Sequence, residues 1–125
     1  MTVSLILKHP ETFKVAVAGA PVIDWKYYEV MYGERYMDTP ESNPDGYKKA
    51  SLLNYVKNLK GKLLIIHGTS DDTVVLQNTI MFLEECIKNG IQLDYFVYPG
   101  QKHSVRGVAR EHLNQLITNY FMNNL

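Results

Sequence analysis

Three short stretches of the chain have the pattern of strands, and the first two described here have that of buried strands. Residues 62–67 contain four consecutive aliphatic side chains and lie between two glycines. Residues 13–20 are mostly apolar and end at Pro21, and residues 92–97 end shortly before a Pro-Gly pair. Apolar runs of this length, bounded by glycine or proline, predict strands rather than helices.

Helical patterns separate and follow these strands. Residues 75–89 predict a helix that ends near Gly90. Its apolar stripe consists of Leu76, Ile80, Leu83 and Ile87. Residues 105–122 predict the final helix. One face of that helix carries Ala109, Leu113, Leu116, Ile117 and Tyr120.

The first half of the chain is less regular. An apolar segment at residues 3–7 predicts a helix that stops at Pro10. The aromatic-rich residues 24–36 predict a helix followed by a turn, and residues 47–59 predict one short helix or two helical turns. Residues 39–46, between them, form a turn-rich loop. Because no capping residue precedes the first helix, we expect the chain to begin inside a larger domain.

Strands that alternate with helices predict an α/β fold, with a parallel sheet flanked by helices. A chain of 125 residues, 46% of them hydrophobic, suffices for one compact domain. The formal net charge is zero, and no cluster of Lys or Arg offers a surface for nucleic acid. The apolar stretches are too short to span a bilayer, so we expect no membrane contact from this segment.

Two loops carry the candidate chemistry. Asp71 lies four residues after the strand that ends at His67, and His103 lies six residues after the strand that ends at Val97. Because the carboxyl ends of parallel strands meet at one edge of a sheet, we expect Asp71 and His103 to lie together. An aspartate that orients a histidine, in this chain order, is typical of the last two members of a Ser-Asp-His triad.

The nucleophile of such a triad is expected outside these residues, because the sequence contains no Gly-x-Ser-x-Gly motif. We therefore interpret residues 1–125 as the C-terminal part of a serine hydrolase domain, which we expect to be inactive by itself. No set of side chains has metal-ligand spacing and no phosphate-binding loop is present, so we expect no metal and no cofactor. The single cysteine, Cys86, is expected to be a packing residue.

Each candidate residue also has a simpler interpretation. A pair of aspartates after a strand often forms a turn and caps the next helix, and we expect Asp72 to do so. His103 alone could be an exposed loop histidine, but the two loops together, at matching strand ends, favour the catalytic interpretation. His67 ends a buried strand and is expected to have a structural hydrogen-bonding role. His9 and His112 are expected at the surface.

Three segments closely resemble the prolyl oligopeptidase family of serine peptidases, and its dipeptidyl peptidase branch in particular: residues 20–28, 32–37 and 67–74. The similarity extends over essentially the whole chain. It implies the C-terminal portion of an α/β-hydrolase fold, in which Asp71 and His103 are the triad aspartate and histidine. It also implies a serine, within a Gly-Trp-Ser-Tyr-Gly-Gly-Tyr motif, a few residues upstream of Met1.

The resemblance further implies a set of substrate-binding residues. The pocket that accepts proline maps onto Val22, Trp25, Tyr28, Tyr32 and Val74. Spacings of three and four residues place the three aromatic members on one helical face, whereas Tyr27 and Tyr36 could be ordinary core residues. Thr73 stands where the family commonly has an asparagine that helps to hold the substrate carbonyl. Ser104 stands where glycine is frequent.

The function implied by the resemblance is that of a serine exopeptidase that releases N-terminal dipeptides, Xaa-Pro and less well Xaa-Ala. Other functions stay open: an oligopeptidase or acylaminoacyl peptidase of the same family, a carboxylesterase, or a non-catalytic interaction domain. The resemblance also implies that these residues are part of a longer protein, called the parent protein below. For that protein it implies a peptide substrate, an N-terminal propeller region and homodimerisation. It implies export, to the periplasm, to the medium, or to a membrane anchor with an external active site.

Overall fold

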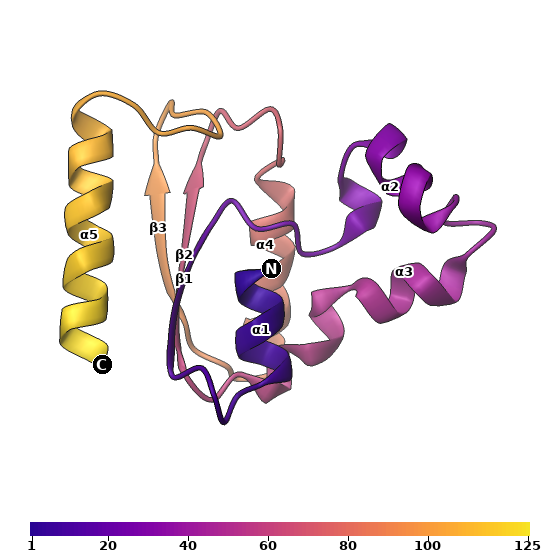
Figure 1. Cartoon of the computed structure of the whole chain (residues 1–125), viewed down its shortest axis with the longest axis horizontal. Coiled ribbons are helices and arrows are strands. Elements are labelled where there is room, and N and C mark those ends of the chain that lie inside the picture. The colour runs from indigo at the N-terminus through magenta and orange to yellow at the C-terminus, as the bar shows by residue number, and fades with distance from the viewer.

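A three-stranded parallel sheet forms the centre of the molecule (Figure 1). The computed structural model describes all 125 residues. The strands are β1 (Val15–Gly19), β2 (Lys62–Gly68) and β3 (Asp94–Tyr98), and their order in the sheet is β1-β2-β3. All three predicted strands are present, and the predicted parallel pairing is confirmed.

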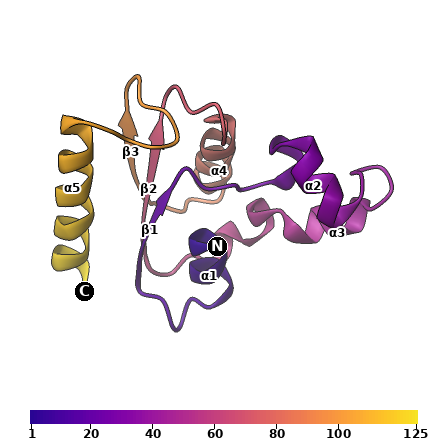
Figure 2. The same cartoon turned by 45° about the horizontal axis from the view of Figure 1, so that its top comes forward.

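Helices cover both faces of the sheet and also extend beyond it. The α-helices are α1 (Thr2–Lys8), α2 (Val30–Met37), α3 (Pro44–Ala50), α4 (Gln77–Lys88) and α5 (Val108–Asn124). The 3₁₀ helices are η1 (Trp25–Tyr27) and η2 (Leu52–Asn58). Helix α5 lies on one face of the sheet, and α1 and α4 lie on the other. Helices α2 and α3 project to the side away from α5, as Figure 2 shows in a second view. No helix has both the length and the apolar composition that a membrane crossing requires.

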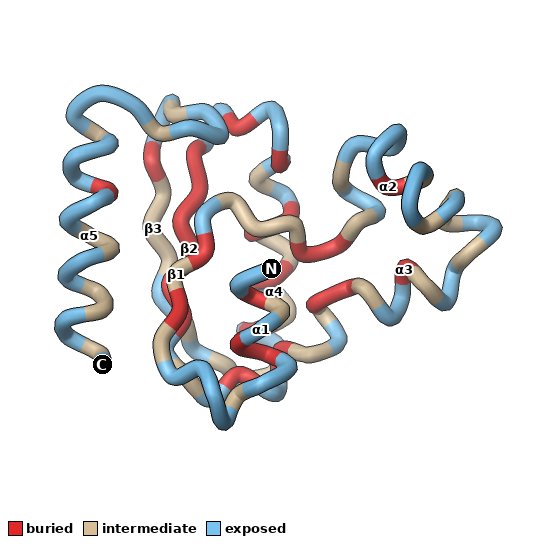
Figure 3. The backbone as a smooth tube through the Cα atoms, in the orientation of Figure 1, coloured by how far each residue is buried: buried red, intermediate tan, exposed pale blue.

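The hydrophobic core is divided between the two faces of the sheet. The larger cluster has 13 buried residues and joins α1, η2, β1, β2 and α4. The cluster under α5 has only 4 buried residues, to which half-buried side chains of α5 add further contacts. Strand β2 is central in the sheet and is buried from Leu63 to Gly68 (Figure 3). The expected apolar face of α5 is confirmed, because all five of its residues pack in the smaller cluster.

The expected stripe of α4 is wrong. Ile87 is 77% exposed, whereas the buried positions of the helix are Asn78, Thr79, Phe82 and Cys86. The buried face is displaced because two of its four members are polar and their hydrogen bonds are made inside the fold. The prediction for Cys86 is confirmed: it packs in the larger core, and burial raises the pKa of its thiol to about 11.

The aromatic segment at residues 24–36 is not a continuous helix. Its first turn is the short η1, capped by the Asp24 carboxylate, which accepts a hydrogen bond from the Lys26 N–H at 3.0 Å. Tyr28 is then extended, with φ −104° and ψ 172°, and α2 begins only at Val30. Residues 47–59 form the end of α3 and the 3₁₀ helix η2. This agrees with the second of the two predicted forms, two helical turns.

Candidate active site

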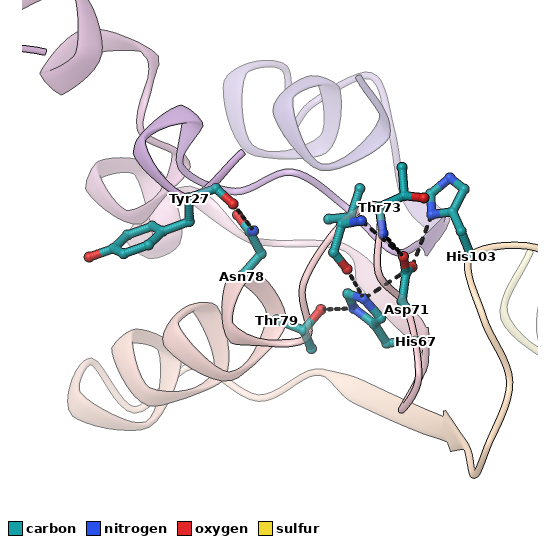
Figure 4. A network of polar contacts seen from close by, with 8 residues as sticks. Tyr27, His67, Asp71, Thr73, Asn78, Thr79 and His103 are labelled. Atoms are coloured by element: carbon teal, nitrogen blue, oxygen red, sulfur yellow. Dashed lines mark hydrogen bonds and ion pairs between the residues drawn. The ribbon is translucent and has the colours of Figure 1, made fainter. Parts of the chain in front are cut away.

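Asp71 and His103 meet at the carboxyl end of the sheet (Figure 4). Asp71 lies in the loop that follows β2, and His103 lies in the loop between β3 and α5. The Asp71 Oδ2 atom is 2.9 Å from the Nδ1 atom of His103. Since a carboxylate oxygen can only accept, the Nδ1–H donates, and the imidazole is held with its Nε2 atom directed away from the carboxylate.

The surroundings of Asp71 keep its carboxylate ionised. The Oδ1 atom accepts hydrogen bonds from the Thr73 and Val74 backbone N–H groups, both at 2.9 Å. Burial alone would raise the pKa of the Asp71 carboxyl. The hydrogen bonds from Val74, His103 and Thr73 outweigh that effect, so the pKa lies below its ordinary value. A buried anion beside the imidazole therefore stabilises a positive charge on His103.

The two loops are joined by backbone contacts that continue the pairing of β2 with β3. The Thr69 N–H donates to the Tyr98 carbonyl at 3.1 Å, and the Thr69 Oγ1 accepts from the Gly100 N–H at 2.7 Å. The Ser70 N–H donates to the Gln101 carbonyl at 3.0 Å. A Cβ atom on Gly68 would lie 2.2 Å from the Gln101 carbonyl oxygen, so only glycine permits this approach.

Asp72 does not cap the following helix, contrary to expectation. Helix α4 has Leu76 at its N-cap position and no side-chain cap. Asp72 instead accepts a hydrogen bond from the Lys102 ammonium at 3.0 Å, on the surface, and this lowers the pKa of its carboxyl. The turn that Asp72 was expected to stabilise is held by Asp71, because the Asp71 carboxylate faces the N–H groups of Thr73 and Val74.

The structural role expected for His67 is confirmed. Its Nε2 atom lies 2.7 Å from the Val74 carbonyl oxygen, so Nε2 carries the proton and donates. Its Nδ1 atom lies 2.7 Å from the Thr79 Oγ1. The Nε2 atom is also 3.4 Å from the Asp71 Oδ2, and both side chains are fully buried. His67 thus fixes the backbone of the loop that contains Asp71. His9 and His112 are exposed, as expected.

His103 is the accessible member of the pair. Its side chain is 46% exposed, and its Nε2 atom makes no hydrogen bond within the chain. His103 lines two hollows. A polar one of about 380 Å³ is also lined by Asp72, Lys102, Ser104 and Arg106, among others. A partly apolar one of about 310 Å³ is lined by residues of β1, β2 and α5. The imidazole can therefore exchange a proton with a group placed in this space.

Three aromatic side chains of the η1–α2 region form one cluster. The ring centroids of Trp25 and Tyr32 are 5.8 Å apart in a stacked arrangement. The Tyr28 ring packs edge-on against both, at 5.5 Å from each. These side chains are brought together by η1 and an extended Tyr28, not by the single helical face that we expected. An apolar hollow of about 180 Å³ adjoins Trp25 and Tyr32.

The remaining sequence-derived substrate residues lie in different places. Val22 lines a separate small hollow near α1. Val74 is buried and takes part in the Asp71 loop through its backbone, and Thr73 is exposed beside it. Tyr27 and Tyr36 are not core residues, contrary to the simpler interpretation, since both are exposed.

Asn78 is a site residue that the sequence analysis missed. It is 1% exposed and lies at the start of α4. Its Oδ1 atom accepts hydrogen bonds from the Ile23 and Asp24 N–H groups, at 3.0 and 3.2 Å. Its Nδ2 donates to the Tyr27 carbonyl at 3.4 Å. The signal in the sequence is the pair of adjacent polar residues, Asn78 and Thr79, inside a helical segment.

The stability of the folded chain should depend on pH through Asp71. Because its pKa is lower in the folded chain than in the unfolded chain, the ionised carboxylate stabilises the fold above the unfolded value of about 3.9. That contribution declines as the pH falls through the folded-state pKa. We expect the difference in free energy of unfolding between the native chain and Asp71→Asn to shrink as the pH falls below about 4. Denaturant titrations at each pH measure it, and a difference that keeps growing below about pH 4 would contradict the assigned pKa direction.

No three His, Cys, Asp or Glu side chains are grouped so that they could share a metal ion. The oriented imidazole of His103 can accept a proton at Nε2 and return it, while the Asp71 carboxylate balances the charge.

Comparisons with known proteins agree on the family of proteins to which this chain is similar. The sequence model of the prolyl oligopeptidase family matches residues 1–125. An Aspergillus oryzae protein designated dipeptidyl-aminopeptidase B is 42% identical over 97 residues, which cover 76% of this chain and 11% of that protein. A Penicillium rubens protein of the same designation is 39% identical over 118 residues, covering 89% of this chain and 13% of that protein.

Two solved structures have the same fold. A Bacteroides ovatus protein designated a dipeptidyl aminopeptidase IV has a TM-score of 0.98 and 58% identity, covering all of this chain and 18% of that one. Porphyromonas gingivalis dipeptidyl peptidase 4 has a TM-score of 0.95 and 39% identity, covering 99% of this chain and 18% of that one. The three parallel strands and their helices match the C-terminal part of an α/β-hydrolase domain. The chain belongs to the prolyl oligopeptidase family of peptidases.

Proposed function

We propose that this chain forms the C-terminal part of the catalytic domain of a serine exopeptidase, which removes N-terminal dipeptides with proline, or less well alanine, in the second position. The observation that carries the proposal is the Asp71–His103 hydrogen bond of 2.9 Å, formed between a buried carboxylate and an accessible imidazole at the carboxyl end of a parallel sheet. This is the edge at which α/β enzymes hold their reacting groups.

In the proposed reaction a serine attacks the carbonyl carbon of the second substrate residue. His103 accepts the serine proton at Nε2 and then donates it to the leaving amine. Asp71 holds the Nδ1–H, which fixes the required tautomer, and it stabilises the imidazolium that forms. Water then releases the dipeptide from the acyl-enzyme, with His103 acting as the base a second time.

The serine itself is assigned to a part of the parent protein outside these 125 residues. The absence of a Gly-x-Ser-x-Gly motif supports this assignment. So does the coverage of the relatives, since the chain spans only 11% to 18% of the lengths of the proteins compared above. The propeller region, homodimerisation and export that the resemblance implies belong to the same proposal for the parent protein.

The substrate preference is assigned to the aromatic cluster of Trp25, Tyr28 and Tyr32. A proline ring is compact and apolar, so flat aromatic faces bury it with little loss of side-chain entropy. Alanine offers less apolar surface to the same faces and should bind less tightly. Val22 and Val74 are proposed to complete the lining, and Thr73 to contact the substrate carbonyl beside Asp71. The relatives designated dipeptidyl peptidases support this choice of substrate class.

The proposal is tested with the parent protein on three nitroanilide substrates, Gly-Pro, Gly-Ala and N-blocked Gly-Pro, and on a simple ester. We expect the highest kcat/KM on Gly-Pro, a lower value on Gly-Ala, and almost no activity on the blocked substrate. Comparable rates on blocked and free substrates would indicate an oligopeptidase or acylaminoacyl peptidase, and activity on simple esters alone would indicate a carboxylesterase. Inactivity on all of them would leave a non-catalytic interaction domain.

A further inference from the structure

Asn78 is the buried polar side chain that connects α4 with the aromatic segment (Figure 4). All three of its hydrogen bonds go to backbone groups between Ile23 and Tyr27. Two of those groups, the N–H groups of Ile23 and Asp24, share the single Oδ1 atom as their acceptor. Asn78 therefore binds the chain immediately before and within η1, which carries Trp25.

Few other contacts hold this segment to the body of the molecule. The Ile23 side chain is buried in the larger core, and its carbonyl accepts from the Leu52 N–H at 2.9 Å. After Ile23, the side chains of Trp25 and Tyr28 are only half-buried, and the ring of Tyr32 is exposed. The backbone at residues 23–27 is thus held to the sheet mainly by Ile23 and Asn78, while α2, which carries Tyr32, is also held to α3 by hydrogen bonds to the Met37 and Asp38 carbonyls.

Thr79, the next residue on the same turn of α4, is connected to the loop that carries Asp71. Thr79 is fully buried, and its Oγ1 contacts the Nδ1 of His67, whose Nε2 donates to the Val74 carbonyl beside Asp71. Adjacent residues of α4 therefore make separate connections: Asn78 reaches the aromatic segment, and Thr79 reaches the Asp71 loop. Helix α4 is the rigid element that both halves share.

We propose that Asn78 is a positioning residue for substrate selectivity: by fixing the backbone at residues 23–27, it sets the place of the aromatic cluster relative to the Asp71–His103 pair. This inference rests on the proposed function. A residue without an acceptor at position 78 leaves two buried N–H groups unpaired, which is costly enough to displace the segment. A displaced aromatic cluster would hold a proline ring poorly, whereas alanine, which uses less of that surface, would be affected less.

The position of the cluster can be measured in the parent protein without any catalysis. The emission of each protein minus that of its Trp25→Phe counterpart isolates the signal of Trp25, the only tryptophan of these 125 residues. In Asn78→Ala we expect a red-shifted Trp25 emission and stronger quenching by acrylamide than in the native chain. Asn78→Gln keeps both the accepting oxygen and the donating NH₂ group, and it should move the spectrum back toward the native one. Thr79→Val, an equally buried change on the same turn, should leave Trp25 unchanged. An unchanged spectrum in folded Asn78→Ala would overturn the inference.

Selectivity is then measured in the parent protein as the ratio of kcat/KM for Gly-Pro and Gly-Ala nitroanilides. We expect Asn78→Ala to lower this ratio about tenfold, mainly through KM for the proline substrate, and Asn78→Gln to stay within about threefold of the native ratio. Thr79→Val should lower both rates by similar factors and keep the ratio. If Asn78→Ala does not fold, Asn78→Ser, which is too short for both N–H groups, takes its place with the same expectation.

The outcomes separate the inference from the proposed function. An equal loss on both substrates in the Asn78 variants would make Asn78 merely structural and overturn the inference. A native parent protein that does not prefer proline to alanine would refute the proposed substrate class, and with it the role in selectivity, even if the Trp25 measurements succeed. A shifted Trp25 signal together with a reduced ratio supports both.

Discussion

Replacing His103 with asparagine in the parent protein should lower kcat by a factor on the order of 10⁴ to 10⁶. His103 is the only histidine whose ring both contacts the Asp71 carboxylate at hydrogen-bond distance and opens to solvent. Asparagine cannot accept the serine proton, so the nucleophile loses its base. Stability should change little, because the side chain is 46% exposed.

The control for this variant is His9→Asn. His9 is also exposed, and its side chain makes no hydrogen bond in the fold, so its replacement should leave kcat close to that of the native protein. Steady-state kinetics on Gly-Pro nitroanilide, with circular dichroism to confirm folding, measures both variants. A folded His103→Asn enzyme that retains more than about a tenth of native kcat would be incompatible with the triad role.

Asp71→Asn should lower kcat by a factor on the order of 10⁴. The amide oxygen can still accept from the Thr73 and Val74 N–H groups, and the NH₂ group then faces His103. An NH₂ group donates to Nδ1, which moves the imidazole proton to Nε2, where it can no longer accept a proton from serine. The loss should therefore arise from the wrong tautomer in an intact fold.

The matched control lies one residue further along. Asp72→Asn removes only the surface pair with Lys102, and exposed ion pairs of this kind contribute little to stability. We expect it to change kcat/KM by less than about tenfold. Kinetics and thermal unfolding of the two variants, measured in parallel, distinguish them. Equal effects of the two substitutions would show that activity depends on the structure of the loop and not on the buried carboxylate.

The sheet and the meeting of Asp71 with His103 could be predicted because both depend on strong local signals. Short runs rich in aliphatic or aromatic residues specify the strands, and the carboxyl ends of parallel strands lie at one edge of the sheet. The loop residues are then brought together by topology, whatever the details of their turns. His67 could also be assigned, because a polar ring at the end of a buried strand needs partners.

The errors have a common physical origin, which is that polar groups inside the fold were satisfied by partners distant in sequence. Asn78 and Thr79 are buried because backbone groups of the aromatic segment and the His67 ring meet them, so hydrophobicity alone misplaced the buried face of α4. The aromatic segment was expected to be a helix followed by a turn, yet its backbone is bound by Asn78, more than fifty residues away, and forms only the short η1 before α2. Such pairings do not follow from local spacing.

Covalent labelling of the parent protein with a fluorophosphonate, followed by mass spectrometry of the labelled peptide, tests most directly whether Asp71 and His103 serve a serine nucleophile. We expect a single labelled serine, located just before the sequence that begins at Met1, with labelling lost in His103→Asn and strongly slowed in Asp71→Asn. Labelling that proceeds at the native rate in both variants, or no labelled serine in the native protein, would contradict the proposed triad.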